Sequence, residues 1–216
     1  MKNVLIIGLG RFGSAMVKPF ADLGNAVVVC DTNEEKIAKV LPYTAAAKIG
    51  DATSEAFVAE LGVENFDLTF VAIGGDIQDS LVAVTLLKDF GAKYIIAKAG
   101  SEMHEKLLTR VGADRTIFPE REAGQRTASI LGRTSVFERI ELEDGYAVYE
   151  IEVPQAWVGK TLKDLNLRAK YGLNVLGVKE SDTSPLHPDF KPNLPFAAGM
   201  RVMLMGKNEE LQQFLA

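Results

Sequence analysis

The first thirty residues constrain the fold of this chain more than any other segment. An apolar run, Val4 to Ile7, is followed by glycines at positions 8, 10 and 13 and by a helix-forming segment, Ser14 to Leu23. Such a turn permits a tight bend, a close approach of the backbone to a pyrophosphate, and close packing of helix on strand. Asp31 ends the next apolar run, where a carboxylate can accept hydrogen bonds from ribose hydroxyls. The sequence therefore predicts a nucleotide site at the N-terminus of the first helix.

Apolar runs and helix-forming segments alternate as far as Phe118. Runs that are apolar throughout are typical of parallel strands covered on both faces, so the alternation predicts a doubly wound, Rossmann-like sheet of about six strands. Thr32 with Glu35 predicts a capping box for the second helix, and Thr53 or Ser54 a cap for the third. We expect strands at 4–7, 26–30, 45–49, 68–73, 94–97 and 116–118, with helices at 14–23, 33–40, 55–61, 79–90 and 102–110.

The pattern changes after Pro119, where one more helix, 121–131, precedes a segment of a different kind. Two alternating strands, 137–142 and 147–153, flank a Glu-Asp-Gly turn that indicates a hairpin. A short helix at 162–169, strands at 173–178 and 201–205, a proline-rich loop at 181–195 and a closing helix at 209–215 follow. We expect a nucleotide-binding domain over 1–135 and a small α+β domain over 136–216.

Composition excludes several classes of function. The formal net charge is −5. Residues 1–135 carry 15 basic and 17 acidic side chains, and residues 136–216 carry 9 basic and 12 acidic ones. Neither part has the excess of positive charge that is typical of nucleic-acid-binding proteins. The single cysteine, Cys30, fits a reducing compartment and a place in the core. The first strand begins too early to leave room for a signal peptide, and no apolar stretch is long enough to span a bilayer.

Several residues could carry chemistry, each beside a plainer alternative. Arg11 offers fork-shaped donors to phosphate, or it is a solvated surface arginine. Asp51 and its neighbours could flank an adenine, or they cap the next helix. Gly74 leaves space for a nucleotide or makes a tight turn. Lys98 could reach phosphate or ribose, or lie on the surface. Glu120 could bind a hard cation weakly, or it is simply the first acid of a helix.

The chain lacks the signatures of a catalytic centre. His104 and His187 are its only histidines, they fall in different predicted domains, and neither stands at a zinc-ligand spacing. No Gly-x-Ser-x-Gly elbow occurs, and the second domain offers no acid–base residue of the kind that dehydrogenases place beside their cofactor. We therefore expect a binding protein. The alternatives are an NAD(H)-dependent oxidoreductase and an NADH-sensing regulator, because both share the glycine turn and Asp31.

Motifs in both predicted domains resemble one family. They are 4–13 (VLIIGLGRFG), 31–36 (DTNEEK), 50–53 (GDAT), 71–74 with Ile77-Gln78, 112–115 running into Pro119-Glu120, and 164–172 (DLNLRAKYG). In this order they are similar to the cytosolic regulatory subunits of Ktr/Trk-type potassium uptake systems, which consist of an RCK, or KTN, nucleotide-binding domain and an RCK C-terminal domain. The resemblance covers essentially the whole chain.

The resemblance implies a regulatory subunit that is not an enzyme. Such subunits form homodimers that assemble into an octameric ring on the cytosolic face of a membrane potassium transporter, and ATP and ADP favour different ring shapes. Arg11 would contact the terminal phosphate, Asp31 the ribose, and Glu120 a divalent cation, Mg²⁺ or Ca²⁺. The residues implied for the nucleotide are Gly8, Gly10, Arg11, Phe12, Gly13, Asp31, Thr32, Asp51, Ala52, Thr53, Ile73, Gly74 and Lys98.

The second domain of some relatives binds cyclic di-AMP, and Arg168 and Asn174 fall in the matching region. Two departures from the family pattern stand out. Asp76 replaces an asparagine of some relatives directly after Gly74-Gly75, which adds a negative charge near the predicted site. The loop from Thr183 to Pro195 does not match, so ligand contacts there transfer least securely. The resemblance places the protein in the cytoplasm, held at the inner membrane face through its transporter.

Overall fold

The computed structural model describes residues 1–132 and 136–214, and the chain divides into two compact units, Met1–Arg121 and Glu122–Ala216. The predicted domain boundary at residue 135 stays a prediction, because residues 133–135 lie outside the described part. The helix and strand bounds of the first unit are β1 Asn3–Ile7, α1 Arg11–Asp22, β2 Ala26–Asp31, α2 Glu34–Val40, β3 Ala46–Ile49, α3 Glu55–Leu61, β4 Leu68–Val71, α4 Ile77–Asp89, β5 Ile95–Lys98, α5 Glu102–Arg110 and β6 Arg115–Ile117.

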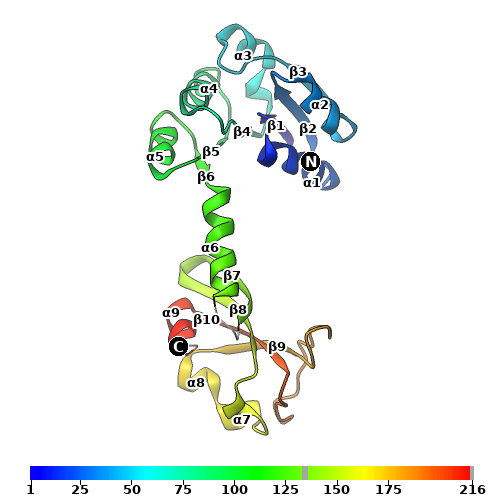
Figure 1. The fold of residues 1–216 in the computed structure, drawn as a ribbon, viewed down its shortest axis with the longest axis vertical. Coiled ribbons are helices and arrows are strands. Elements are labelled where there is room, and N and C mark those ends of the chain that lie inside the picture. Colours follow the sequence, from blue (N-terminus) through cyan, green and yellow to red (C-terminus); the bar gives the residue numbers. More distant parts are fainter. Residues whose placement is uncertain (133–135, 215–216) are drawn as a thin grey trace. The chain divides into compact units, whose positions relative to one another are not determined.

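The first unit is the predicted doubly wound fold. Its six strands are parallel and stand in the order β3-β2-β1-β4-β5-β6 (Figure 1). Alternate residues of β1 point to opposite faces, so Val4 and Ile6 pack with α1 and α2, whereas Leu5 and Ile7 pack with α3, α4 and α5. Because the connections leave in opposite directions on the two sides of β1, the carboxyl ends of β1 and β4 flank a crevice where ligands bind in this fold.

The second unit is the predicted α+β domain. Helix α6, Pro119–Leu131, begins in the first unit and continues into the second. The remaining elements are β7 Val136–Glu141, β8 Tyr146–Glu152, α7 Leu162–Leu165, α8 Leu167–Tyr171, β9 Asn174–Lys179, β10 Arg201–Lys207 and α9 Asn208–Phe214. The strands form an antiparallel sheet in the order β7-β8-β10-β9, and the 143–145 turn closes the expected hairpin. Residue 215 of the predicted last helix lies outside the described residues.

Several local expectations are wrong, and for three of them the structure shows the physical reason. The first helix begins at Arg11 rather than Ser14, because the glycine turn itself supplies its first residues. The second helix is capped by Asn33, whose side chain accepts hydrogen bonds from the backbone N–H groups of Glu35 and Lys36, so Thr32 makes no capping box. The predicted helix 162–169 is two helices, since Asn166 adopts a left-handed conformation (φ 45°) between them.

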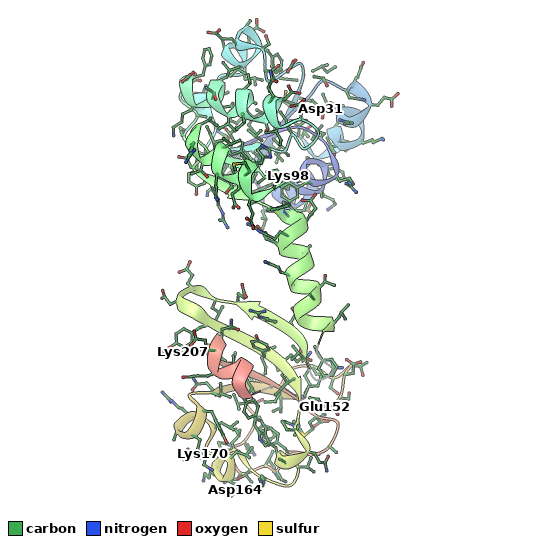
Figure 2. The ribbon with its side chains drawn as sticks, turned by 60° about the vertical axis from the view of Figure 1, so that its left-hand side comes forward. Asp31, Lys98, Glu152, Asp164, Lys170 and Lys207 are labelled. Atoms are coloured by element: carbon green, nitrogen blue, oxygen red, sulfur yellow. The ribbon has the colours of Figure 1, made fainter. Side chains whose placement is uncertain are left out.

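Some of the other element ends agree with the sequence pattern, and the start of α4 and the end of β4 do not. Ser54 caps α3 through a hydrogen bond from the Phe57 N–H. Thr161 and Asp164 form a capping box at α7 (Asp164 is labelled in Figure 2), and Gly172 ends α8 at φ 66°. Asp76 caps α4, which begins at Ile77 rather than at the predicted residue 79, and its carboxylate accepts hydrogen bonds from the backbone N–H groups of Gln78 and Asp79. The strand β4 ends at Val71, two residues before the predicted end.

A methyl group at position 13 should destabilise the first unit. A Cβ on Gly13 would lie 1.9 Å from the carbonyl oxygen of Gly8, a backbone atom that cannot move aside cheaply. We expect Gly13→Ala to lower the free energy of unfolding by about 1–3 kcal/mol or more, the usual cost of overpacking. The matched control is Gly124→Ala in α6, where a Cβ would meet no atom within 4 Å. Equal urea midpoints for the two variants would contradict this expectation.

Candidate functional site

A cavity of about 380 Å³ opens at the carboxyl ends of β1, β2, β4 and β5 in the first unit. It lies at the topological switch point of the sheet, where ligands bind in this fold. Gly13 does not line it. The other residues predicted for the nucleotide all do: Gly8, Gly10, Arg11, Phe12, Asp31, Thr32, Asp51, Ala52, Thr53, Ile73, Gly74 and Lys98.

The glycine turn leaves its space to a ligand. Gly8 has φ 91°, and a Cβ there would lie 3.0 Å from the carbonyl carbon of Ala72 at the end of β4. Gly10 differs, because a Cβ there would meet no atom within 4 Å, so its missing side chain opens room that the protein itself does not fill. Gly10 caps α1 without a side-chain hydrogen bond, and the first turn holds no acidic residue. This end of α1 is therefore suited to a phosphate group.

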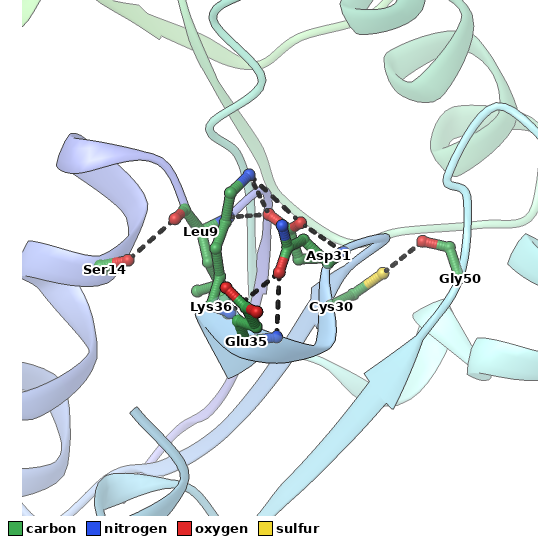
Figure 3. Close-up of polar contacts among 8 residues, drawn as sticks. Leu9, Ser14, Cys30, Asp31, Glu35, Lys36 and Gly50 are labelled. Atoms are coloured by element: carbon green, nitrogen blue, oxygen red, sulfur yellow. Dashed lines mark hydrogen bonds and ion pairs between the residues drawn. The ribbon is translucent and has the colours of Figure 1, made fainter. Parts of the chain in front are cut away.

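The carboxylate of Asp31 joins the glycine turn to the loop after β2. It is 7% exposed, and it accepts hydrogen bonds from the Leu9 N–H at 2.6 Å and the Asn33 N–H at 2.9 Å. The Lys36 ammonium lies 3.3 and 3.4 Å from its two oxygens (Figure 3). Asp31 thus orders the site as well as lining it, and a ribose would meet a carboxylate that already has several donors.

The loop after β3 is ordered by its own side chains. Asp51 accepts from the Thr53 N–H at 2.8 Å and the Thr53 hydroxyl at 2.7 Å. The backbone hydrogen bond from Thr53 is the main reason that the pKa of the Asp51 carboxyl lies below its ordinary value. Ala52 between them is buried and lines the cavity. The loop therefore presents a fixed edge to the cavity, while Ser54 caps the following helix.

Lys98 at the end of β5 pairs with Glu120 in the first turn of α6. The ammonium lies 2.7 Å from a Glu120 oxygen, and the lysine side chain is 16% exposed, whereas that of the glutamate is 58% exposed. The hydrogen bond from Lys98 is the main reason that the pKa of Glu120 lies below its ordinary value, and the charge of Arg11 adds to it. Glu120 itself does not line the cavity. Figure 2 labels Asp31 and Lys98 in the first unit.

The cysteine of the chain lies in the core of the first unit. Cys30 is 1% exposed, so it is a core residue as predicted. Burial raises the pKa of its thiol to about 12, so the thiol stays protonated near neutral pH. Among residues 1–132 and 136–214, no group of three or more His, Cys, Asp and Glu side chains could hold a metal ion. No helix of that part of the chain is both long and apolar enough to cross a bilayer.

Two charged lining residues were missed by the sequence reasoning. Lys36 lies in the first turns of α2 and faces Asp31, and Asp79 lies in the first turn of α4. Both belong to helices that start at the carboxyl end of a strand, which is the one signal that could have found them.

The region matched to cyclic di-AMP in relatives lies in α8 and β9 of the second unit. Arg168 is exposed there and Asn174 is half-buried. Part of the unmatched loop is tied to β9, because His187 and Val178 exchange backbone hydrogen bonds of 2.8 and 3.1 Å. Nothing in this geometry singles out a ligand.

Both units match described protein families. The model of the TrkA-N domain matches residues 4–119, and that of the TrkA-C domain matches residues 147–216. Ktr system potassium uptake protein C of Bacillus subtilis is 38% identical over 188 residues, which are 86% of this chain and 85% of that protein. Ktr system potassium uptake protein A of the same organism is 35% identical over 213 residues, covering 99% and 95%.

The fold has a counterpart among solved structures. The GsuK channel bound to NAD superposes with a TM-score of 0.68 at 19% sequence identity. The match covers 99% of this chain and 39% of that channel chain. At this identity the likeness is one of fold.

His104 should make the first unit sensitive to mild acid. The imidazole is buried between α4 and α5, where its Nδ1 accepts from the Gly100 N–H at 3.2 Å and its Nε2 lies 2.7 Å from the Ser80 hydroxyl. Since Nδ1 accepts, the neutral ring donates from Nε2 to Ser80, which donates to the Ile77 carbonyl at 2.8 Å. Burial lowers the pKa of His104 below 6.5.

Because the unfolded chain binds this proton more readily, the stability that the neutral ring contributes above about pH 6.5 should be lost as the pH falls below that value. Between the pKa of His104 in the unfolded chain and its lower pKa in the folded chain, the free energy of unfolding should fall by up to about 1.4 kcal/mol per pH unit. Urea unfolding from pH 7.5 to 5.5 measures it, and His104→Asn, which cannot titrate, should flatten the slope. A variant with the slope of the original chain would show that another group is responsible.

Proposed function

This chain belongs to the family of Ktr and Trk potassium uptake proteins, and we propose that it binds adenine nucleotides as the ATP/ADP-controlled regulatory subunit of a potassium transporter. It is a homologue of the regulatory subunits of those systems, related over nearly its whole length. The observation that carries the proposal is the cavity at the switch point of the sheet, with the open space at Gly10 on one side and the Asp31 carboxylate on another.

Arg11 supplies the discrimination between ATP and ADP in this proposal. Two nucleotides can shift a shape equilibrium in different directions only if they make different contacts. Arg11 lines the cavity in the first turn of α1, and a guanidinium there can hold a terminal phosphate by paired hydrogen bonds. Asp31 takes the ribose, and Asp51, Ala52 and Thr53 flank the base.

Glu120 takes a divalent cation in this proposal only together with the nucleotide. A single carboxylate is a poor site by itself, but Mg²⁺ is commonly held by one or two carboxylates and the phosphates of a bound substrate. Lys98, now 2.7 Å from Glu120, would first turn to a phosphate. The cation would then replace the ammonium beside the carboxylate.

The proposal includes the assembly that the family resemblance implies: homodimers that form an octameric ring on the cytosolic face of the transporter, without catalysis. Cyclic di-AMP would be a second ligand at Arg168 and Asn174. Light scattering on the purified protein, alone and with ATP or ADP, measures the mass of the assembly. Calorimetry with ATP, ADP, NAD and NADH identifies the ligand.

Binding of ATP and ADP by an octamer-sized particle supports the proposal. Selective binding of NADH by a small dimer would instead support a redox regulator, and a nicotinamide absorbance change with a substrate would support an oxidoreductase. A folded sample that binds no adenine compound would refute nucleotide control.

Removal of the Arg11 guanidinium should weaken ATP more than ADP. We expect Arg11→Ala to cost about 1.5–3 kcal/mol for ATP, the usual value of a hydrogen bond to a charged group, and much less for ADP. Titration calorimetry measures both affinities. Arg110→Ala is the control, because this arginine lies in the last turn of α5 and does not line the cavity. Equal losses for ATP and ADP would remove Arg11 from the terminal phosphate.

A further inference from the structure

Lys36 occupies the part of the cavity where the proposed nucleotide would place its ribose. It extends from α2 across the end of β2, and its ammonium spans both oxygens of Asp31 at 3.3 and 3.4 Å (Figure 3). The lysine side chain is 45% exposed, whereas that of Asp31 is 6% exposed. The pair therefore joins a fixed, buried carboxylate to a cation that can move.

The hydrogen bonds of Asp31 show which donor can be replaced. The Leu9 N–H reaches one oxygen at 2.6 Å and the Asn33 N–H reaches the other at 2.9 Å. Both belong to backbone that the carboxylate itself holds in place. With Lys36 against both oxygens, the four acceptor positions of the carboxylate are in use. A ribose hydroxyl can therefore bind Asp31 only where Lys36 withdraws, and the freed ammonium then needs an anionic partner.

We propose that Lys36 determines specificity at the ribose end of the cavity and lets it accept adenine nucleotides that carry a phosphate on the ribose 2′-oxygen. This inference rests on the proposed function, since it assumes that an adenosine binds with its ribose at Asp31. A carboxylate alone would repel such a phosphate and select the free hydroxyl. When Lys36 withdraws to admit the ribose, its ammonium stays near Asp31, offsets part of the carboxylate charge and can pair with the added phosphate.

The surroundings leave Lys36 as the cation suited to this task. The two N–H groups of the first turn of α2 that Asn33 caps are already bound, and Glu34 and Glu35 in that turn are acidic, so the helix end is unsuited to a phosphate. The other cations that line the cavity, Arg11 and Lys98, belong to the glycine turn and to β5. A phosphate on the ribose would thus find its charge-assisted hydrogen bond at Lys36.

The test compares ADP with 2′-phospho-ADP, which is ADP carrying one more phosphate on its 2′-oxygen. Titration calorimetry on the full chain gives both affinities for the original protein and for Lys36→Met, Lys36→Arg and Lys39→Met. Lys39 is the matched control, because it lies on the same helix, is exposed, and does not line the cavity. Thermal melting confirms that each variant is folded.

We expect the original protein to bind both ligands, with affinities within about tenfold of each other. Lys36→Met should weaken 2′-phospho-ADP by about tenfold or more, because one hydrogen bond between charged groups is lost. ADP should bind unchanged or up to about fivefold more tightly, since a weak competitor for Asp31 is gone. Lys36→Arg should retain most of the affinity for 2′-phospho-ADP, and Lys39→Met should leave both ligands unaffected.

Three results would overturn the inference: rejection of 2′-phospho-ADP by a protein that binds ADP, equal effects of Lys36→Met on the two ligands, or equal effects of Lys36→Met and Lys39→Met. In each of these cases the original protein still binds ADP, so the proposed function survives. Failure of the original, folded protein to bind ADP, ATP or any other adenine nucleotide would instead refute the proposed function.

Discussion

The approach of Gly13 to the carbonyl of Gly8 is the constraint on which the rest of the site depends. Only a residue without a Cβ allows α1 to start directly against the turn, since an added methyl carbon would lie 1.9 Å from that oxygen. Two consecutive hydrogen bonds then join the turn to β2. The Gly8 N–H donates to the carbonyl oxygen of Cys30, and the Leu9 N–H donates to the carboxylate of Asp31. The phosphate end of the cavity is thereby built before any ligand arrives, so little has to be ordered on binding.

The sequence predicted the sheet well because its central strands β1, β2 and β4 are mostly buried on both faces. Continuous apolar runs such as Val4 to Ile7 have no competing amphipathic interpretation once the glycine turn follows them. The short-range errors have a common cause. Thr32 and Asn33 are both good capping residues, and only the backbone geometry decides that Asn33 is used. At Asn166 one left-handed residue separates two helices, and no glycine or proline between residues 162 and 171 marks the break in the sequence.

The candidate site was predictable wherever backbone geometry requires a residue type. Gly8 is required by its positive φ and by its close approach to Ala72, and Asp31 is favoured by its place at the end of β2. Lys36 was missed because a lysine in the first turns of a polar helix looks like any solvated cation. Its role depends on where α2 starts relative to Asp31, and that start was itself mispredicted through the cap at Asn33. Side chains that reach a site across an element boundary are therefore the hardest to find from sequence.

Two ion pairs of similar construction lie at opposite ends of the cavity lining. At one end the buried Asp31 carboxylate is paired with the mobile Lys36, and at the other the largely buried Lys98 is paired with the mobile Glu120. In each pair the partner on the strand is the more buried one, and the partner on a helix, α2 or α6, is the more exposed one. An anionic ligand that draws Lys98 toward its phosphates must release Glu120, and Glu120 lies in the first turn of α6, the helix that carries the chain out of the first unit. In the proposed function, the charge of the nucleotide thus acts on α6 through competition for one ammonium, which requires no strain in the sheet.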